Sequence, residues 1–265
     1  MTRKRPTVHD LLSWKGQRQL SMLRIFTLDE AAAAEAAGID IVSAPPELVT
    51  HPEYRNRAPS LFSMTGLTHL EAGTPDDYLR FSGEMLGKGA DALYCSGSFE
   101  TVARLSREHI PIVGHVGIVP ARVTWTGGYR AVGKTAAEAL EILDQCRRFE
   151  EAGAIAVEIE VVPQEVATEI SARMKKLLLW SMGSGPGCDA QYLFAEDILG
   201  ETRGRVPRHA QVYRNFAAEY ERLQAERIAA FSEFIADIES GAFPARSQVV
   251  SMPEDELSAF RSALG

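Results

Sequence analysis

The sequence predicts an α/β protein, a single-domain (β/α)8 TIM barrel over residues 1–265 with an N-terminal helix and a C-terminal helical arm. Three observations support this fold. Short apolar runs alternate with amphipathic stretches, as in parallel strands joined by helical crossovers. Gly38, Gly89 and Gly153 each stand between an expected helix and the next expected strand, where a left-handed residue can turn the chain. The 265 residues also fit the roughly 250 that such a barrel needs.

The apolar runs predict strands near residues 22–26, 39–43, 61–64, 92–95, 112–114, 156–160 and 177–181, with a weak eighth near Arg205. Helices are expected over 28–37, 75–88, 135–152 and 209–240. The helix from Thr135 illustrates the reasoning, because Thr135 can cap it, Glu138 follows three residues later, and apolar residues recur at helical spacing. The tail after Gly241, which contains Pro244 and Pro253, is expected to be an irregular arm.

Composition and net charge limit the classes of function that we expect for the protein. A hydrophobic content of 45% with 24% charged residues fits a folded soluble protein, and no apolar run reaches the roughly 18 residues that span a bilayer. The N-terminus shows no signal-peptide core, so we expect a cytoplasmic protein. Cys95, Cys146 and Cys188 show no Cys-x-x-Cys spacing, which predicts reduced thiols and no zinc site. A net charge of -8 argues against nucleic-acid binding and favours a small-molecule partner.

Two glycine-rich segments suggest anion binding. Gly128 and Gly133 precede Lys134-Thr135 in the pattern of a P-loop, which would indicate a nucleotide hydrolase. A P-loop follows a buried strand directly, whereas residues 122–127 are polar, so this interpretation is disfavoured. Residues 183–187, Gly-Ser-Gly-Pro-Gly, are consistent either with a phosphate site after the seventh strand or with a tight turn.

Taken whole, residues 114–134 resemble the signature of the ketopantoate hydroxymethyltransferase family: Gly-His-Val-Gly-Ile-Val-Pro at 114–120 and Trp-Thr-Gly-Gly-Tyr-Arg-Ala-Val-Gly-Lys at 125–134. The resemblance continues at residues 158–163, 183–185, 207–209, 239–244 and 252–257, and so covers nearly the whole chain. It implies a (β/α)8 barrel of pantothenate synthesis that is usually a homo-oligomer of ten subunits. It also implies transfer of a hydroxymethyl group from methylene-tetrahydrofolate to 3-methyl-2-oxobutanoate.

The resemblance assigns catalytic functions to two residues. Glu160, before Val-Val-Pro at the end of the sixth strand, matches the general base that forms an enolate from the 2-oxo acid. The alternative for Glu160 is an ion pair at the rim of the barrel. His115 matches a histidine beside the substrate carbonyl, and the alternative is a core histidine with satisfied hydrogen bonds. We expect Tyr94, Ser96, Ser43 and Lys134 to bind substrate. Cys95 is a weaker nucleophile candidate, since a buried cysteine is usually inert packing.

The sequence departs from the family where the family holds its metal. The metal aspartate after the second strand falls at Ala44, the one after the third strand at Gly66 or a neighbour, and the acid after the fourth strand at Ser96. None of these residues is acidic, and Mg²⁺ prefers several oxygen ligands, so the usual magnesium site is expected to be absent.

Three explanations of this departure are open. Hydrogen-bond donors such as Tyr94, Ser96 and His115 could stabilise an enolate without a metal. A metal site could have moved to Glu158 and Glu160, which face the same side of one strand, with His69 and Glu71 as further ligands. The barrel could also have become a non-catalytic subunit that binds a small ligand or a partner.

Overall fold

The computed structural model of the chain describes residues 3–67 and 71–265. The chain divides into two compact units, one ending at Arg214 and the other spanning Asn215–Gly265. The first unit holds all the strands, and the second consists of helices and their connections.

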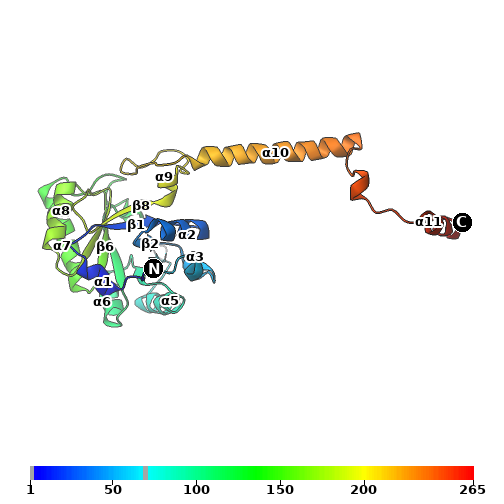
Figure 1. Ribbon diagram of the computed structural model, residues 1–265. Coiled ribbons are helices and arrows are strands. Elements are labelled where there is room, and N and C mark those ends of the chain that lie inside the picture. Colours follow the sequence, from blue (N-terminus) through cyan, green and yellow to red (C-terminus); the bar gives the residue numbers. More distant parts are fainter. Residues whose placement is uncertain (1–2, 68–70) are drawn as a thin grey trace. The chain divides into compact units, whose positions relative to one another are not determined.

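Eight parallel strands close into a barrel in chain order (Figure 1), which confirms the predicted fold. Their bounds are β1 Leu20–Arg24, β2 Ile41–Ser43, β3 Phe62–Gly66, β4 Ala92–Tyr94, β5 Ile112–Gly117, β6 Ala156–Glu160, β7 Leu178–Met182 and β8 Ala190–Phe194. The first seven overlap the predicted strands. The prediction of the eighth near Arg205 was wrong, because β8 lies earlier and closes the barrel by pairing with β1 from Leu20 opposite Ala190 to Arg24 opposite Phe194.

Helices join and surround the strands, and they are α1 Val8–Ser13, α2 Leu28–Ala37, α3 Pro46–Val49, α4 Tyr54–Arg57, α5 Pro75–Gly87, α6 Phe99–Arg107, the short 3-10 helix η1 Pro120–Arg122, α7 Ala136–Glu151, α8 Gln164–Arg173 and α9 Ala195–Leu199. The glycines expected to turn the chain do so, since Gly38, Gly89 and Gly153 all have positive φ. Only residues 183–189 connect β7 to β8, and no helix lies between them. This short link explains why the eighth strand was misplaced: the sequence pattern led us to expect a helical crossover before it.

The core has two layers. Inside the barrel, alternate strand residues form one apolar cluster that includes Met22, Phe62, Met64 and Trp180. Leu11 of α1 belongs to the same cluster, so α1 closes the N-terminal end of the barrel. The intervening strand residues pack in a second cluster with the surrounding helices. At the C-terminal end of the barrel, polar strand residues such as Ser43, His115 and Glu158 take the place of these apolar side chains. A functional site is therefore expected at the C-terminal mouth of the barrel.

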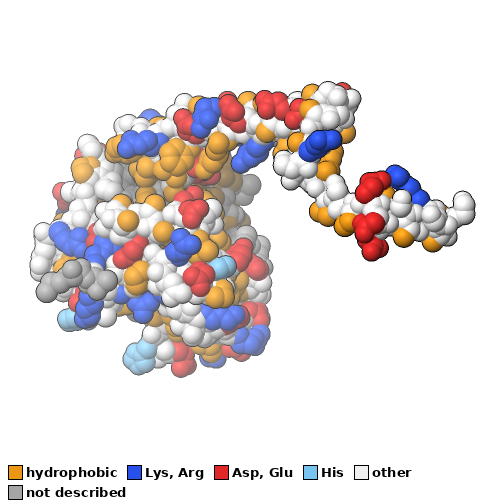
Figure 2. All heavy atoms as spheres, turned by 45° about the vertical axis from the view of Figure 1, so that its right-hand side comes forward, with side chains coloured by type: hydrophobic (Ala, Val, Ile, Leu, Met, Phe, Trp, Pro, Cys, Tyr) orange, Lys and Arg blue, Asp and Glu red, His pale blue; other side chains and the backbone are white. Residues whose placement is uncertain are grey.

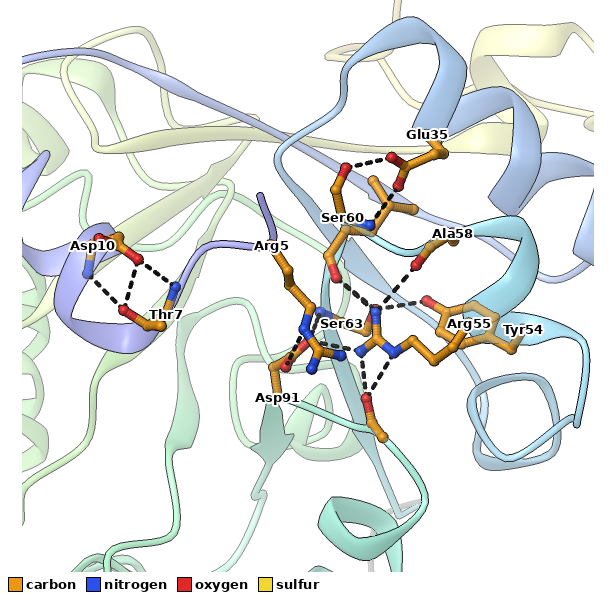
Figure 3. Close-up of polar contacts among 12 residues, drawn as sticks. Arg5, Thr7, Asp10, Glu35, Tyr54, Arg55, Ala58, Ser60, Ser63 and Asp91 are labelled. Atoms are coloured by element: carbon orange, nitrogen blue, oxygen red, sulfur yellow. Dashed lines mark hydrogen bonds and ion pairs between the residues drawn. The ribbon is translucent and has the colours of Figure 1, made fainter. Parts of the chain in front are cut away.

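An ion-pair network fixes the N-terminal end of β3 and β4 (Figure 3). The Asp91 carboxylate accepts hydrogen bonds from Arg55 Nη2 at 2.7 Å and from the backbone N–H of Ser63 at 2.8 Å. Arg5 Nε lies 3.5 Å from the same carboxylate. Arg55 also donates to the carbonyls of Gly89 and Leu61. One carboxylate thereby joins the N-terminal segment, α4, β3 and the start of β4.

The second unit comprises α10 Phe216–Ser240, the 3-10 helix η2 Arg246–Gln248 and α11 Glu254–Ala263. Helix α10 was expected from residue 209 but begins at Phe216, where the Asn215 side chain accepts a hydrogen bond from the N–H of Ala218. None of the α10 residues is buried, and hydrophobic side chains lie along the helix (Figure 2). Among the described residues, no helix combines the length and the apolar character needed to cross a membrane.

Candidate active site

A cavity of about 340 Å³ opens at the C-terminal mouth of the barrel. Strand pairing explains which side chains reach it, since Arg24 lies opposite Ser43, Gly66 opposite Tyr94, and His115 opposite Glu158. The cavity is lined by Arg24, Phe26, Ser43, Gly66, Leu67, Tyr94, Glu158, Tyr192 and Phe194. Its size suits a small organic acid.

A histidine lies between two carboxylates at this mouth. His115 Nδ1 is 3.1 Å from the Tyr94 hydroxyl and 3.5 Å from Glu158 Oε2, while His115 Nε2 is 3.1 Å from Glu160 Oε2. The Nε2–Glu160 contact is close but not a well-aligned hydrogen bond, because Nε2 is buried and finds no hydrogen-bond partner in the described part of the chain. Proton-accepting and proton-donating groups from β4, β5 and β6 therefore meet at one place.

The Glu158 carboxyl in this cluster has a strongly altered acidity. Burial raises the pKa of its carboxyl from 4.5 to about 7, since the charged form loses water; His115 lowers this pKa, and the neighbouring Glu160 charge raises it. The residue is only 7% exposed, and Trp180, its pairing partner on β7, is fully buried in the barrel interior. A carboxyl group with a pKa near neutrality can both accept and release a proton under ordinary conditions.

Two tyrosines complete the walls of the cavity. Burial raises the pKa of Tyr94 above its ordinary value, and the Glu158 charge raises it further. Tyr192 of β8 is affected by the same two causes, while a hydrogen bond with Ser43 opposes the rise. Both phenols therefore keep their protons and remain hydrogen-bond donors toward a bound anion.

The structure places the expected residues in different surroundings. Ser43 and Tyr94 line the mouth cavity. Glu160 does not line this cavity, but it points toward His115, and its side chain is 16% exposed, so it is not turned outward into solvent. Ser96 lies next to α5, where its hydroxyl is 3.4 Å from the Tyr78 hydroxyl.

Lys134 lines a second cavity of about 590 Å³ beside the mouth, together with Arg208, His209 and the glycine-rich turn between β7 and β8. Tyr192 lines both cavities. Burial lowers the pKa of His209 in this second cavity, whereas the Glu160 charge raises it.

The residues at the family's metal positions do not fit a magnesium ion. Ala44 packs in the layer between barrel and helices, and the neighbouring residue that faces the mouth is Ser43. Gly66 has no side chain, and Ser96 is directed toward Tyr78. Glu158 and Glu160 do face one side, as expected, yet residues 3–67 and 71–265 contain no group of three or more His, Cys, Asp or Glu side chains arranged to hold a metal. His69 lies outside the described residues.

The two other glycine-rich patterns have local structural explanations. The backbone N–H groups of Gly133 and Lys134, which a P-loop would offer to phosphate, both donate to the Glu138 carboxylate at 3.0 Å. Thr135 caps α7, as predicted. The turn after β7 is fixed by Ser184, whose N–H donates to Ser181 and whose hydroxyl donates to the carbonyl of Ile159. The N–H groups of Gly133 and Lys134 are therefore not available to a phosphate.

Cys95 faces away from the mouth and packs in the outer core layer. Burial raises the pKa of its thiol to about 11, which leaves it protonated and weakly nucleophilic.

Sequence reasoning missed Arg24 and Tyr192. Arg24 ends an otherwise apolar alternation on β1, and a charged residue at a strand end facing a barrel mouth was the available signal. Tyr192 was hidden because the eighth strand was placed too late in the chain.

Comparison with known proteins decides the family. The family model for ketopantoate hydroxymethyltransferase matches residues 47–246, which is most of the chain. The chain belongs to this family. A relative from Hyperthermus butylicus, a 3-methyl-2-oxobutanoate hydroxymethyltransferase, is 39% identical over 70% of the chain and 62% of its own length. The chain matches 59% of the length of the Halalkalibacterium halodurans enzyme of the same name, at 34% identity over 64% of the chain. The match to the Pyrobaculum calidifontis enzyme is longer, at 29% identity over 92% of the chain and 97% of that relative.

Solved structures share the fold. A 2,3-dimethylmalate lyase of the PEP mutase/isocitrate lyase superfamily has a TM-score of 0.50 at 13% identity, covering 97% of this chain and 98% of that one. A phosphonopyruvate hydrolase gives the same score and identity over 97% and 99%. These similarities support the barrel architecture.

Proposed function

We propose that this protein forms a carbon–carbon bond at C3 of a 2-oxo acid through an enolate, in a hydroxymethyl transfer or a closely related aldol-type reaction. The observation that carries the proposal is the Glu158–His115–Glu160 cluster beside Tyr94 at the mouth of the barrel. Enolate formation requires a base near the C3 hydrogen and a hydrogen-bond donor near the carbonyl oxygen, and this cluster contains groups of both kinds.

In the proposed step, a carboxylate takes the proton from C3. The C3–H electron pair forms the C2=C3 bond, and the carbonyl oxygen becomes an oxyanion. Glu160 is the proposed base because it matches the family's strand-end glutamate, and Glu158 is the second candidate because it lines the cavity. His115 and the Tyr94 hydroxyl are the proposed donors to the oxyanion. The enolate carbon then adds to a one-carbon unit at the oxidation level of formaldehyde: the π electrons of its C=O bond move to oxygen, which takes a proton to become the new hydroxyl, and the C2 carbonyl re-forms. Methylene-tetrahydrofolate and one water together would supply this unit, with tetrahydrofolate as the other product.

Methylene-tetrahydrofolate is the co-substrate that the family resemblance implies. The second cavity, of about 590 Å³, supports this proposal because it shares Tyr192 with the mouth and carries Lys134 and Arg208, two cations that suit an anionic ligand. The residues at the mouth do not fit Mg²⁺, so no step of the proposal uses a metal.

The test follows exchange of the C3 proton of 3-methyl-2-oxobutanoate in deuterated water by proton NMR, with and without a chelator. Wild-type protein is expected to catalyse exchange, and the chelator is expected not to stop it. Glu160→Gln and Glu158→Gln are measured separately, and the base is the residue whose loss abolishes exchange while the acid still binds. Binding of the acid without any catalysed exchange would refute the enolate proposal and favour a ligand-binding barrel.

We further propose a homo-oligomer that works in the cytoplasm, as the resemblance implies. The support within the second unit is an apolar stripe on α10, formed by Ile228, Phe231, Ile235 and Ile238 at helical spacing and at least half exposed. Sedimentation of the full chain tests the assembly. Phe231→Glu together with Ile235→Glu is expected to lower the measured mass, and a wild-type monomer would contradict the proposal.

A further inference from the structure

A carboxylate substrate at this mouth must overcome an electrostatic obstacle. Glu158 and Glu160 lie on one side of the site, and each negative charge there repels an incoming acid. The resemblance implies that the family meets this difficulty with a metal, but Ala44, Gly66 and Ser96 cannot supply its ligands. A different positive charge is therefore needed inside the cavity.

Arg24 provides such a charge. It is the last residue of β1 and lines the mouth cavity. Its Nη1 donates to the Ser43 hydroxyl at 2.8 Å, and its guanidinium carbon lies 5.1 Å from the centre of the Phe26 ring. These two contacts orient the guanidinium group, and the Arg24 charge lowers the pKa of both Glu158 and Tyr192.

The guanidinium group retains donors for a ligand. Within the described residues, the bond to Ser43 is its single hydrogen bond, and no carboxylate lies within ion-pair distance. None of its nitrogens is both buried and without a partner, so the remaining N–H groups are accessible to solvent, and Arg24 is one of the residues that line the cavity. A planar guanidinium with free N–H groups matches the two oxygens of a carboxylate.

The arrangement around the cavity gives the bound acid one orientation. Arg24, Ser43 and Tyr192 come from the adjacent strands β1, β2 and β8, whereas Tyr94, His115 and the two glutamates come from β4, β5 and β6. A short 2-oxo acid whose carboxylate lies at Arg24 extends its carbonyl and C3 toward the acid–base cluster.

We propose that Arg24 binds the substrate carboxylate directly and supplies the positive charge that the residues at the family's metal positions cannot hold. Ser43 and Tyr192 are the additional donors. This inference rests on the proposed function for the identity of the ligand, a 2-oxo acid, but it concerns binding and not the proton transfer.

The experiment measures binding of 3-methyl-2-oxobutanoate by calorimetry, with 3-methyl-2-butanone as the matched ketone without a carboxylate. Wild-type protein is expected to bind the acid and not the ketone, with an affinity unchanged by a chelator or by added Mg²⁺. Arg24→Met is expected to weaken binding by about 100-fold, because a charged partner is lost. Arg24→Lys keeps the charge and loses the two-pronged geometry, so a loss of about tenfold is expected.

Arg80→Met is the control, since Arg80 is an exposed residue of α5 that pairs with Asp77 and does not line the mouth cavity. Unchanged circular dichroism confirms that each variant folds. Equal binding by wild type and Arg24→Met, no binding of the acid by wild type, or binding that disappears with chelator would each overturn the inference. Binding through Arg24 without proton exchange would instead refute only the proposed function.

Discussion

Replacing Glu158 by Gln should stabilise the protein at alkaline pH and not at acidic pH. The pKa of this carboxyl rises from 4.5 to about 7 because burial penalises its charged form. Below about pH 4.5 the folded and unfolded states both hold the proton, so burial of the carboxyl costs little. As the pH rises toward 7, the unfolded state releases the proton first, and the folded state loses relative stability.

The magnitude follows from the difference between the two pKa values. Each pKa unit corresponds to about 1.36 kcal/mol, so the unfolding free energy of wild type falls by about 3 kcal/mol as the pH rises from below 4.5 to above about 7. Glutamine cannot ionise and does not incur this loss. The variant should therefore gain about 3 kcal/mol over wild type at about pH 8 and almost nothing at about pH 4.5.

Urea denaturation of both proteins at these two pH values measures the effect, because the difference between variant and wild type cancels the titration of the groups that do not interact with Glu158. A melting temperature should show the same trend, with an increase of roughly 2 to 4 °C for each kcal/mol in a chain of this size. A stability difference that does not change with pH would refute the reasoning, because it would place the Glu158 carboxyl in contact with water.

Three further predictions follow from other parts of the chain. Gly117→Ala should lower the unfolding free energy by more than about 1 kcal/mol and slow the exchange of the substrate C3 proton. Gly117 has a φ of 85°, and an added Cβ would lie 2.3 Å from the Glu160 carbonyl oxygen. An unchanged urea midpoint and an unchanged exchange rate would contradict this prediction. Asp91→Ala should lower the unfolding free energy measured in urea by roughly 3 kcal/mol, since it leaves Arg55 and the Ser63 N–H without their partner. The folded variant should bind the acid as wild type does. Asp76→Ala, which removes an exposed pair with Arg104, is the matched control. Burial raises the pKa of Cys95 to about 11 and those of Cys146 and Cys188 to about 12. A maleimide reagent should therefore label no thiol in the native protein and all three in urea. Rapid labelling of the native protein would contradict this prediction, because it would show that the core opens.

The sequence by itself determined the α/β class, the order of the first seven strands and the family. The fold class and the strands follow from the local periodicity of apolar residues, and the family follows from contiguous motifs. Both kinds of pattern can be recognised without knowing which residues meet in space. It also brought His115 and Glu160 into the candidate site, because the motifs around them resemble those of the family. The eighth strand escaped this reasoning, since residues 183–189 replace the expected helical crossover with a short turn.

Only the tertiary structure decided which of two adjacent residues faces the mouth, placing Ser43 in the cavity and Ala44 in the outer layer. A shift of one residue along a strand reverses the side chain's direction, and sequence patterns locate strands less precisely than that. The structure also brought Arg24 of β1, Tyr192 of β8 and Glu158 of β6 around one cavity. Such proximity arises from closure of the barrel, which joins residues separated by most of the chain, and the acidity of Glu158 depends on the water that this closure removes.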